Sequence, residues 1–208
     1  MAKCPQEALT LEGEWKSVDE VTRICLQDRV FYEGSGGGVT LSGGEPMMQA
    51  DFAAELLHRL KQEGISTAIE TTGFAPASVF HRLMPDIDLY LFDCKQYDCQ
   101  KHLAATGVPN DQILQNLKTA LQAGKDVIVR IPVIPGVNSS LEDAEGFCAV
   151  LRPLGAKRIN LLPFHQFGER KYDFLNRNYQ LRGISALHES DLTAFRDIFV
   201  KNGFDCYF

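Results

Sequence analysis

The sequence predicts an α/β fold in which helices cover a parallel sheet. Amphipathic helical stretches alternate with short extended segments along the 208 residues. The connections between them are short, which favours parallel strands joined by helices. Several predicted strands are near-continuous apolar runs, as expected for strands that helices cover. About five strand–helix repeats are too few for a closed eight-stranded barrel, so a partial barrel and an open doubly wound sheet both fit.

In the first half of the chain, local signals mark where the elements begin and end. Ser17 and Glu20 form a capping box, which predicts a helix start. Gly64 follows an amphipathic stretch, as glycine does at many helix C-termini, and Pro85 ends a weaker helix. The predicted helices cover 18–25, 52–60 and 76–84, and the predicted strands cover 39–41, 67–70 and 87–92.

In the second half, the run at 127–131 is rich in β-branched residues and predicts a strand. Ser140 is expected to cap a helix that ends before Pro153. Ser190 is expected to cap the last helix, which Gly203 closes. The remaining predicted elements are a helix over 113–121 and strands over 159–162 and 204–208.

Composition excludes several classes of protein. With 45% hydrophobic and 23% charged residues, the chain is not expected to be disordered. The formal net charge of −6 argues against a nucleic-acid partner, and no apolar run approaches the about 18 residues of a membrane span. The start of the sequence carries no apolar segment typical of a secretory signal. The six cysteines are irregularly spaced, so we expect reduced thiols and a cytoplasmic location.

Six of the 17 glycines fall between Gly34 and Gly44. In Ser42-Gly43-Gly44-Glu45, the glycines allow backbone groups to approach a ligand, and a carboxylate follows at once. This combination suits a bound ammonium group, which donates hydrogen bonds to carbonyls and to Glu45. It suits phosphate poorly and matches neither common phosphate-binding glycine motif. The alternative is an ordinary glycine-rich turn.

Charged and polar residues cluster at the C-terminal ends of the predicted strands, where α/β folds place their chemistry. Asp93 and Lys95 are two residues apart and would share one face of a strand, where they form either a zwitterion or cation site or a simple ion pair. Arg130 interrupts an apolar strand, so it needs a partner. That partner is either a ligand carboxylate or hydroxyl, or Glu70 or Asp93 in a structural salt bridge.

His165 follows the strand predicted over 159–162. A histidine at such a position is either a structural hydrogen-bonding group or a ligand-binding one. Together, these groups provide an acceptor for ammonium, partners for a carboxylate and hydrogen-bonding groups for a sugar. The ligand class inferred from the residues is an amino acid or a cofactor that carries one.

Several motifs of the chain, in the same order, resemble those of the glycyl-radical enzyme activating enzymes of the radical S-adenosylmethionine superfamily. The resemblance covers nearly the whole chain, and its long glycine motif is specific to this group. The matching motifs are Ser35-Gly36-Gly37-Gly38-Val39-Thr40-Leu41-Ser42-Gly43-Gly44-Glu45-Pro46, Asp93-Cys94-Lys95-Gln96, Arg130 with Val133-Ile134-Pro135-Gly136, and Leu161-Leu162-Pro163-Phe164-His165 with Gly168 and Lys171-Tyr172.

The resemblance implies a partial (β/α)6 barrel that binds S-adenosylmethionine and a [4Fe–4S] cluster. Such enzymes cleave the cofactor reductively to a 5′-deoxyadenosyl radical, which removes a hydrogen atom from a glycine of a partner glycyl-radical enzyme. The electron comes from a flavodoxin or a ferredoxin-type donor. The partners therefore include a protein substrate, and neither nucleic acid nor membrane is expected.

By the same resemblance, Gly43, Gly44 and Glu45 would hold the ammonium group of the cofactor, and Lys95 would meet its carboxylate. A cation site near that carboxylate would be formed by Asp93 with Glu70 and Thr71. The cofactor would also be lined by Arg130 and His165, and its adenine would be flanked by Pro132 and Leu162. The resemblance assigns no catalytic side chain to this chain.

Two features depart from the family pattern. Glu70 stands where the family's best-studied member has aspartate. The motif C-x-x-x-C-x-x-C, which supplies the three thiolates of the cluster, is absent, because the cysteines stand at 4, 25, 94, 99, 148 and 206. In this family the cluster loop follows the first barrel strand, so the resemblance implies a barrel lacking its first strand and its cluster loop. Such a chain is expected to be inactive and to leave an exposed sheet edge.

Cys4-Pro5 resembles the end of a ferredoxin-like cluster insert. We therefore expect 1–14 to be the remnant of such an insert, with Cys4 as a former ligand of an auxiliary [4Fe–4S] cluster, and 15–208 to be the barrel core. The alternative is an ordinary terminal cysteine. Two other functions stay open: a non-catalytic module that docks a glycyl-radical enzyme, and a radical S-adenosylmethionine enzyme that acts on a small molecule.

Overall fold

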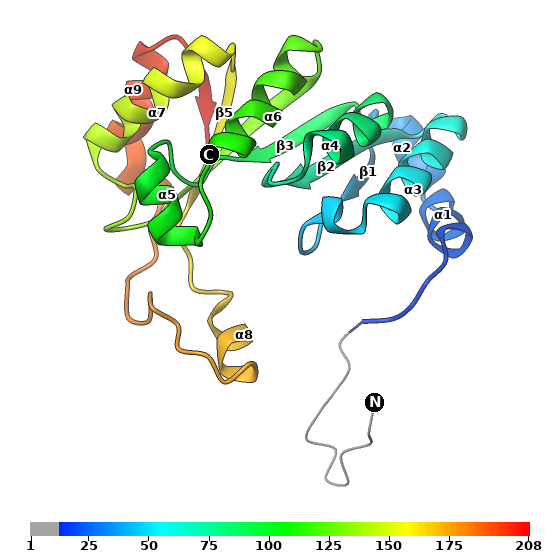
Figure 1. Cartoon of the computed structure of the whole chain (residues 1–208), viewed down its shortest axis with the longest axis horizontal. Helices are drawn as coiled ribbons and strands as arrows, with labels where there is room; N and C mark the ends of the chain where they lie inside the picture. Colours follow the sequence, from blue (N-terminus) through cyan, green and yellow to red (C-terminus); the bar gives the residue numbers. More distant parts are fainter. Residues whose placement is uncertain (1–12) are drawn as a thin grey trace, which may run out of the picture.

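The computed structural model describes residues 13–208 and contains a six-stranded sheet (Figure 1). All pairs of neighbouring strands are parallel, and the order in the sheet is the order in the sequence. The predicted parallel α/β fold is therefore confirmed. The expected remnant around Cys4 lies outside the described residues. The strands are β1 (Gly38–Leu41), β2 (Ser66–Thr71), β3 (Leu89–Asp93), β4 (Asp126–Val133), β5 (Arg158–Pro163) and β6 (Asp205–Tyr207).

Helices and short 3-10 turns connect these strands (Figure 1). Sequential order with helical connections is the pattern of a partial β/α barrel. No helix of the described part is long and apolar enough to cross a membrane. The α-helices are α1 (Val18–Leu26), α2 (Arg29–Ser35), α3 (Ala50–Gln62), α4 (Ala77–Leu83), α5 (Cys99–Thr106), α6 (Asp111–Gln122), α7 (Leu141–Leu154), α8 (Glu169–Phe174) and α9 (Thr193–Lys201), and the 3-10 turns are η1 (Pro46–Gln49), η2 (Met84–Asp86) and η3 (Glu189–Leu192).

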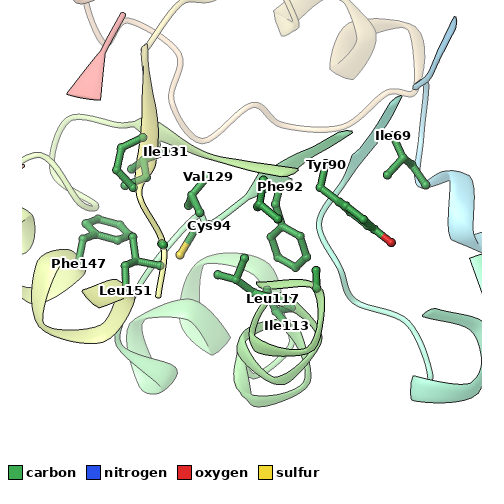
Figure 2. Packing of buried hydrophobic residues seen from close by; sticks show 14 of the residues in the cluster. Ile69, Tyr90, Phe92, Cys94, Ile113, Leu117, Val129, Ile131, Phe147 and Leu151 are labelled. Carbon is green, nitrogen blue, oxygen red and sulfur yellow. The ribbon is translucent and has the colours of Figure 1, made fainter. Parts of the chain in front are cut away.

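One face of the sheet packs against the helices and forms the hydrophobic core with them. Phe92 of β3 and Val129 of β4 are fully buried and belong to one cluster with Leu117 of α6 and Phe147 of α7. Figure 2 shows the ring of Phe92 pointing from its strand toward the helix that carries Leu117. Burying this apolar surface is the main source of the stability of the fold.

The opposite face of the sheet is only half covered. Along β2, β3 and β4, buried residues alternate with partly exposed ones, which is the period of an extended strand. The partly exposed positions include Glu70, Asp93 and Arg130. The same alternation places Asn160 of β5 on this face, which we call the open face of the sheet. Polar groups occupy it because water still reaches it.

Two predicted helix boundaries are wrong. Helix α7 does not end before Pro153 but continues through it to Leu154. Gly155 ends the helix instead, because its backbone adopts a φ of 89° and its N–H donates to the carbonyls of Leu151 and Arg152. The predicted cap at Ser140 is confirmed, with Ser140 Oγ accepting from the N–H of Asp143 at 3.0 Å.

Ser190 is not the cap of the last helix. It lies inside η3, and the capping position belongs to His188, whose N–H donates to Asp191 Oδ2 at 2.8 Å. Helix α9 follows η3 directly and ends just before Gly203, as predicted. Helices α2, α5 and α8 were not predicted. They bury almost no side chain, with only His102 of α5 buried, so their sequences carry no apolar stripe.

Candidate functional site

An arginine joins two carboxylates on the open face at the C-terminal ends of β2, β3 and β4. Arg130 lies directly opposite Asp93 in the strand register, and its Nε and Nη2 donate to Asp93 Oδ1 at 3.0 and 2.8 Å. The same Nη2 also donates to Glu70 Oε1. The salt bridge was one of two alternatives for Arg130 in the sequence. The structure contains it, and both candidate partners, Glu70 and Asp93, take part in it.

The electrostatics of this cluster follow from its partial burial. The Arg130 side chain is 15% exposed and that of Asp93 is 17% exposed. Burial raises the pKa of Asp93, against the hydrogen bond from Arg130, which lowers it. Hydrogen bonds from Ser42 and then from Arg130 lower the pKa of Glu70. Burial lowers the pKa of Arg130, but the two carboxylates together outweigh burial and raise it.

Glu45 is held by the end of β2. Its Oε1 accepts from Thr71 Oγ1 at 2.7 Å, and its Oε2 accepts from the N–H and the hydroxyl of Thr72 at 2.9 and 2.7 Å. Glu45 also caps η1 through the N–H of Met47 at 3.3 Å. Thr71 thus contacts Glu45, whereas its predicted partner Glu70 accepts instead from Ser42 Oγ at 2.7 Å.

The glycines of the predicted ammonium site form an exposed turn between β1 and η1. Gly43 has a φ of 108°, which side-chain-bearing residues rarely adopt. A Cβ added at Gly43 or Gly44 would meet no atom within 4 Å. These glycines therefore leave open space and exposed backbone groups directly beside Glu45.

Lys95 lies two residues past Asp93, just beyond the end of β3. Within residues 13–208, no carboxylate lies within 4 Å of its ammonium group, because Asp93 pairs with Arg130 instead. Pro132 and Leu162 are direct neighbours in the register of β4 and β5, and both are partly exposed. His165 is exposed in the loop after β5, where its ring packs on Phe167 with the centroids 4.4 Å apart.

Four buried carboxamides brace the loops that follow the strands, and sequence reasoning missed this role for all of them. Asn116 of α6 donates to the carbonyls of Gly73 and Ala75 at 2.8 and 2.9 Å. The other three are Gln96, Asn110 and Asn138, which bind the carbonyls of the loops after β3 and β4. The sequence carried no signal that would have found them, because a carboxamide in a loop or, as with Asn116, inside a helix reads the same whether it is buried or exposed.

The residues in 13–208 do not fit an iron–sulfur cluster. No group of three or more histidine, cysteine, aspartate or glutamate side chains among them gathers as a metal site. Burial raises the pKa of the thiols of Cys94 and Cys206 to about 12 and that of Cys148 to about 11, so these thiols stay protonated rather than becoming thiolate ligands.

The same residues do fit S-adenosylmethionine. The sheet end offers an exposed glycine turn beside the carboxylate of Glu45 for an ammonium group, the Lys95 ammonium for a carboxylate, and the half-buried surface of Pro132 and Leu162 for an apolar ring. This donor and acceptor set complements an amino-acid-bearing nucleoside.

Comparison with known proteins gives three consistent matches. The family model of the radical SAM superfamily matches residues 4–148. The choline trimethylamine-lyase activating enzyme of Oleidesulfovibrio alaskensis is 44% identical over 90% of this chain and 62% of its own length. The pyruvate formate-lyase 2-activating enzyme of Escherichia coli is 39% identical over 97% of this chain and 69% of its own length. The chain thus spans between 62% and 69% of these two relatives.

Solved structures agree on the fold. A domain of a pyruvate-formate lyase-activating enzyme from Bacteroides vulgatus superposes with a TM-score of 0.68 at 29% identity, covering 82% of this chain and 98% of that domain. A radical SAM methyltransferase from Sphaerobacter thermophilus superposes with a TM-score of 0.69 at 15% identity, covering 92% of this chain and 57% of the methyltransferase.

Proposed function

Because this chain belongs to the radical SAM superfamily, among the activating enzymes of glycyl-radical enzymes, we propose that it is the cofactor-binding part of such an enzyme. When bound and reduced by one electron, S-adenosylmethionine would supply the radical chemistry by which a hydrogen atom is removed from a glycine of the partner enzyme. The electron donor is a flavodoxin or a ferredoxin-type protein. One observation carries the proposal: Glu45, Lys95 and Pro132 lie at or just beyond the C-terminal ends of neighbouring parallel strands, and Arg130 lies in the C-terminal half of β4.

Each residue at this sheet end has a proposed role. Glu45, fixed by Thr71 and Thr72, accepts from the ammonium group of the cofactor, beside the backbone of Gly43 and Gly44. Lys95 donates to its carboxylate.

The rest of the site surrounds the remainder of the cofactor. Pro132 and Leu162 flank the adenine, and His165 lies near the ribose. Arg130 holds Glu70 and Asp93 in place. A cation bound between these two carboxylates would compete with the guanidinium group for the same oxygens.

Replacing Lys95 with alanine tests the carboxylate contact. We expect the affinity for S-adenosylmethionine, measured by calorimetry, to fall about tenfold, since a charge-assisted hydrogen bond is lost. Lys157→Ala is the matched control, because Lys157 is exposed at the start of β5, at the opposite end of the sheet. Equal affinities for the wild type and K95A, or no binding by the wild type, would refute the proposed site.

Anaerobic reconstitution with iron and sulfide tests whether these 208 residues suffice for the reaction. The sequence holds no C-x-x-x-C-x-x-C motif, so we expect no site-differentiated [4Fe–4S] cluster and no 5′-deoxyadenosine. A full-length relative treated in parallel serves as the positive control. A stable cluster that supports 5′-deoxyadenosine formation in this chain would contradict the expectation.

A second candidate is a non-catalytic module that docks a glycyl-radical enzyme, which needs none of the cluster thiolates and so is equally compatible with these 208 residues. The genomic sequence upstream of the Met1 codon separates the two. An in-frame C-x-x-x-C-x-x-C motif there supports the enzyme, and a stop codon supports the module.

A further inference from the structure

Asn138 binds three backbone groups from two different segments of the chain. Its side chain is fully buried, and Asn138 Nδ2 donates to the carbonyls of Lys95 and Pro132, both at 2.8 Å. Asn138 Oδ1 accepts from the N–H of Ile134 at 2.7 Å. One side chain therefore joins the loop after β3 to the end of β4 and the turn that follows it.

Gln96 makes the reciprocal connection. It is 1% exposed, and its Nε2 donates to the carbonyl of Val137 at 3.1 Å, while its Oε1 accepts from the N–H of Tyr97 at 2.8 Å. The two loops thus each send a buried carboxamide into the backbone of the other. We call Asn138 and Gln96 the carboxamide pair. Breaking either connection would leave buried carbonyls without donors, which is costly.

Lys95 lies inside the segment that this pair holds. On one side, the N–H of Cys94 donates to the carbonyl of Arg130 at 2.8 Å; on the other side, Gln96 is anchored. The Lys95 ammonium has no carboxylate partner within the described residues. No salt bridge therefore fixes its side chain, and Asn138 binds the backbone of Lys95 directly.

We propose that Asn138 is a positioning residue: by holding the Lys95 carbonyl against the end of β4, it aims the Lys95 ammonium at the carboxylate of the bound cofactor. This inference rests on the proposed function, in which Lys95 binds that carboxylate. It predicts that Asn138 affects recognition of the carboxylate selectively, rather than binding in general.

The test compares S-adenosylmethionine with decarboxylated S-adenosylmethionine, which keeps the ammonium group and the adenosine but lacks the carboxylate. For Asn138→Leu, we expect the affinity for S-adenosylmethionine to fall about tenfold and that for the decarboxylated compound to change by less than about twofold. In the double variant N138L/K95A, the affinity for S-adenosylmethionine should fall no further than in K95A alone, since both changes remove the same interaction.

Asn116→Leu is the matched control. Asn116 is equally buried and also binds two carbonyls, but it braces the loop after β2, next to the residues that hold Glu45. Because both compounds carry the ammonium group, we expect N116L to weaken both to the same extent. Gln96→Met removes the reciprocal hydrogen bond and should reproduce the selective effect of N138L, and it replaces that variant if N138L does not fold.

Equal losses for the two compounds in N138L and in Q96M would overturn the proposal and assign the carboxamide pair a purely structural role. A different result would contradict the proposed function itself: K95A would then bind S-adenosylmethionine with the same affinity as the wild type. Hydrogen exchange of the unliganded protein gives a separate readout. N138L should speed amide exchange in 94–97, and N116L in 71–76; unchanged exchange in 94–97 would contradict the bracing of Lys95.

Discussion

Replacing Arg130 with methionine should lower the free energy of unfolding by about 3 kcal/mol, because it removes one partner of a half-buried charge cluster. Methionine keeps most of the apolar stem but leaves Asp93 and Glu70 without the guanidinium group that now neutralises both. Urea unfolding at neutral pH measures the loss. Affinity for S-adenosylmethionine should fall in the same variant, since the open face near the proposed carboxylate site then carries two uncompensated negative charges.

Arg158→Met is the matched control for this change. Arg158 at the start of β5 pairs with Asp126 at the start of β4, at the opposite end of the sheet, where both side chains are 34% or more exposed, so the loss should stay within about 1 kcal/mol. Equal losses in the two variants would show that the cluster contributes no more than a surface ion pair.

The free energy of unfolding, measured as a function of pH, tests the same charge cluster. In the wild type, the lowered pKa of Glu70 adds stability above the unfolded pKa of about 4.3, and this contribution is lost as pH falls through the folded pKa. In R130M, protonation of Glu70 and Asp93 relieves their mutual repulsion. The stability gap between R130M and the wild type should therefore narrow as the pH falls below about 5. A gap that is constant with pH would contradict the assignment.

Gly73→Ala should lower the free energy of unfolding by about 3 to 4 kcal/mol, from backbone strain and overpacking together. Gly73 has a φ of 69°, and an added Cβ would lie 2.1 Å from Cζ of Phe92, a fully buried core residue. The change also displaces the loop that holds Glu45 through Thr72. Thermal unfolding and the affinity for S-adenosylmethionine should both be affected.

Gly124→Ala separates the two causes. Gly124 has almost the same backbone conformation, with a φ of 71°, but an added Cβ would meet no atom within 4 Å. Only the strain of the left-handed conformation remains, which costs about 1 to 2 kcal/mol. If G73A and G124A lose the same free energy of unfolding, the contact between the added methyl group and Phe92 contributes nothing to the cost at Gly73.

The sheet could be predicted from the sequence because its strands carry a local signal. Val127, Val129 and Ile131 alternate with residues of the open face, and the glycines after the helices mark where the chain turns back. The residues alone left the strand order open, because a partial barrel and an open doubly wound sheet both fitted, and only the family resemblance favoured the sequential order that the sheet has. By contrast, α7 was expected to end before Pro153 but continues past it, because its end is decided by Gly155, whose N–H donates to the last carbonyls from a left-handed conformation.

The composition of the site was predictable, but its pairing was not. Arg130 had two candidate partners in the sequence, and only the register of β3 against β4 and the reach of its guanidinium group show that it takes both. Asn116 and Asn138 were not recognised because a buried carboxamide belongs to no periodic pattern. Its role depends on which carbonyls the fold brings within hydrogen-bonding distance.

Hydrogen exchange with and without S-adenosylmethionine tests most directly the claim that this cofactor binds at the C-terminal end of the sheet. We expect slower exchange in the segments at and after the strand ends, at 42–46, 93–97, 130–138 and 163–166, with no change in α3. Slower exchange confined instead to the cavity lined by Lys101, Ser140 and Asp143, between α5 and the start of α7, would contradict that claim, as would no change anywhere in the chain.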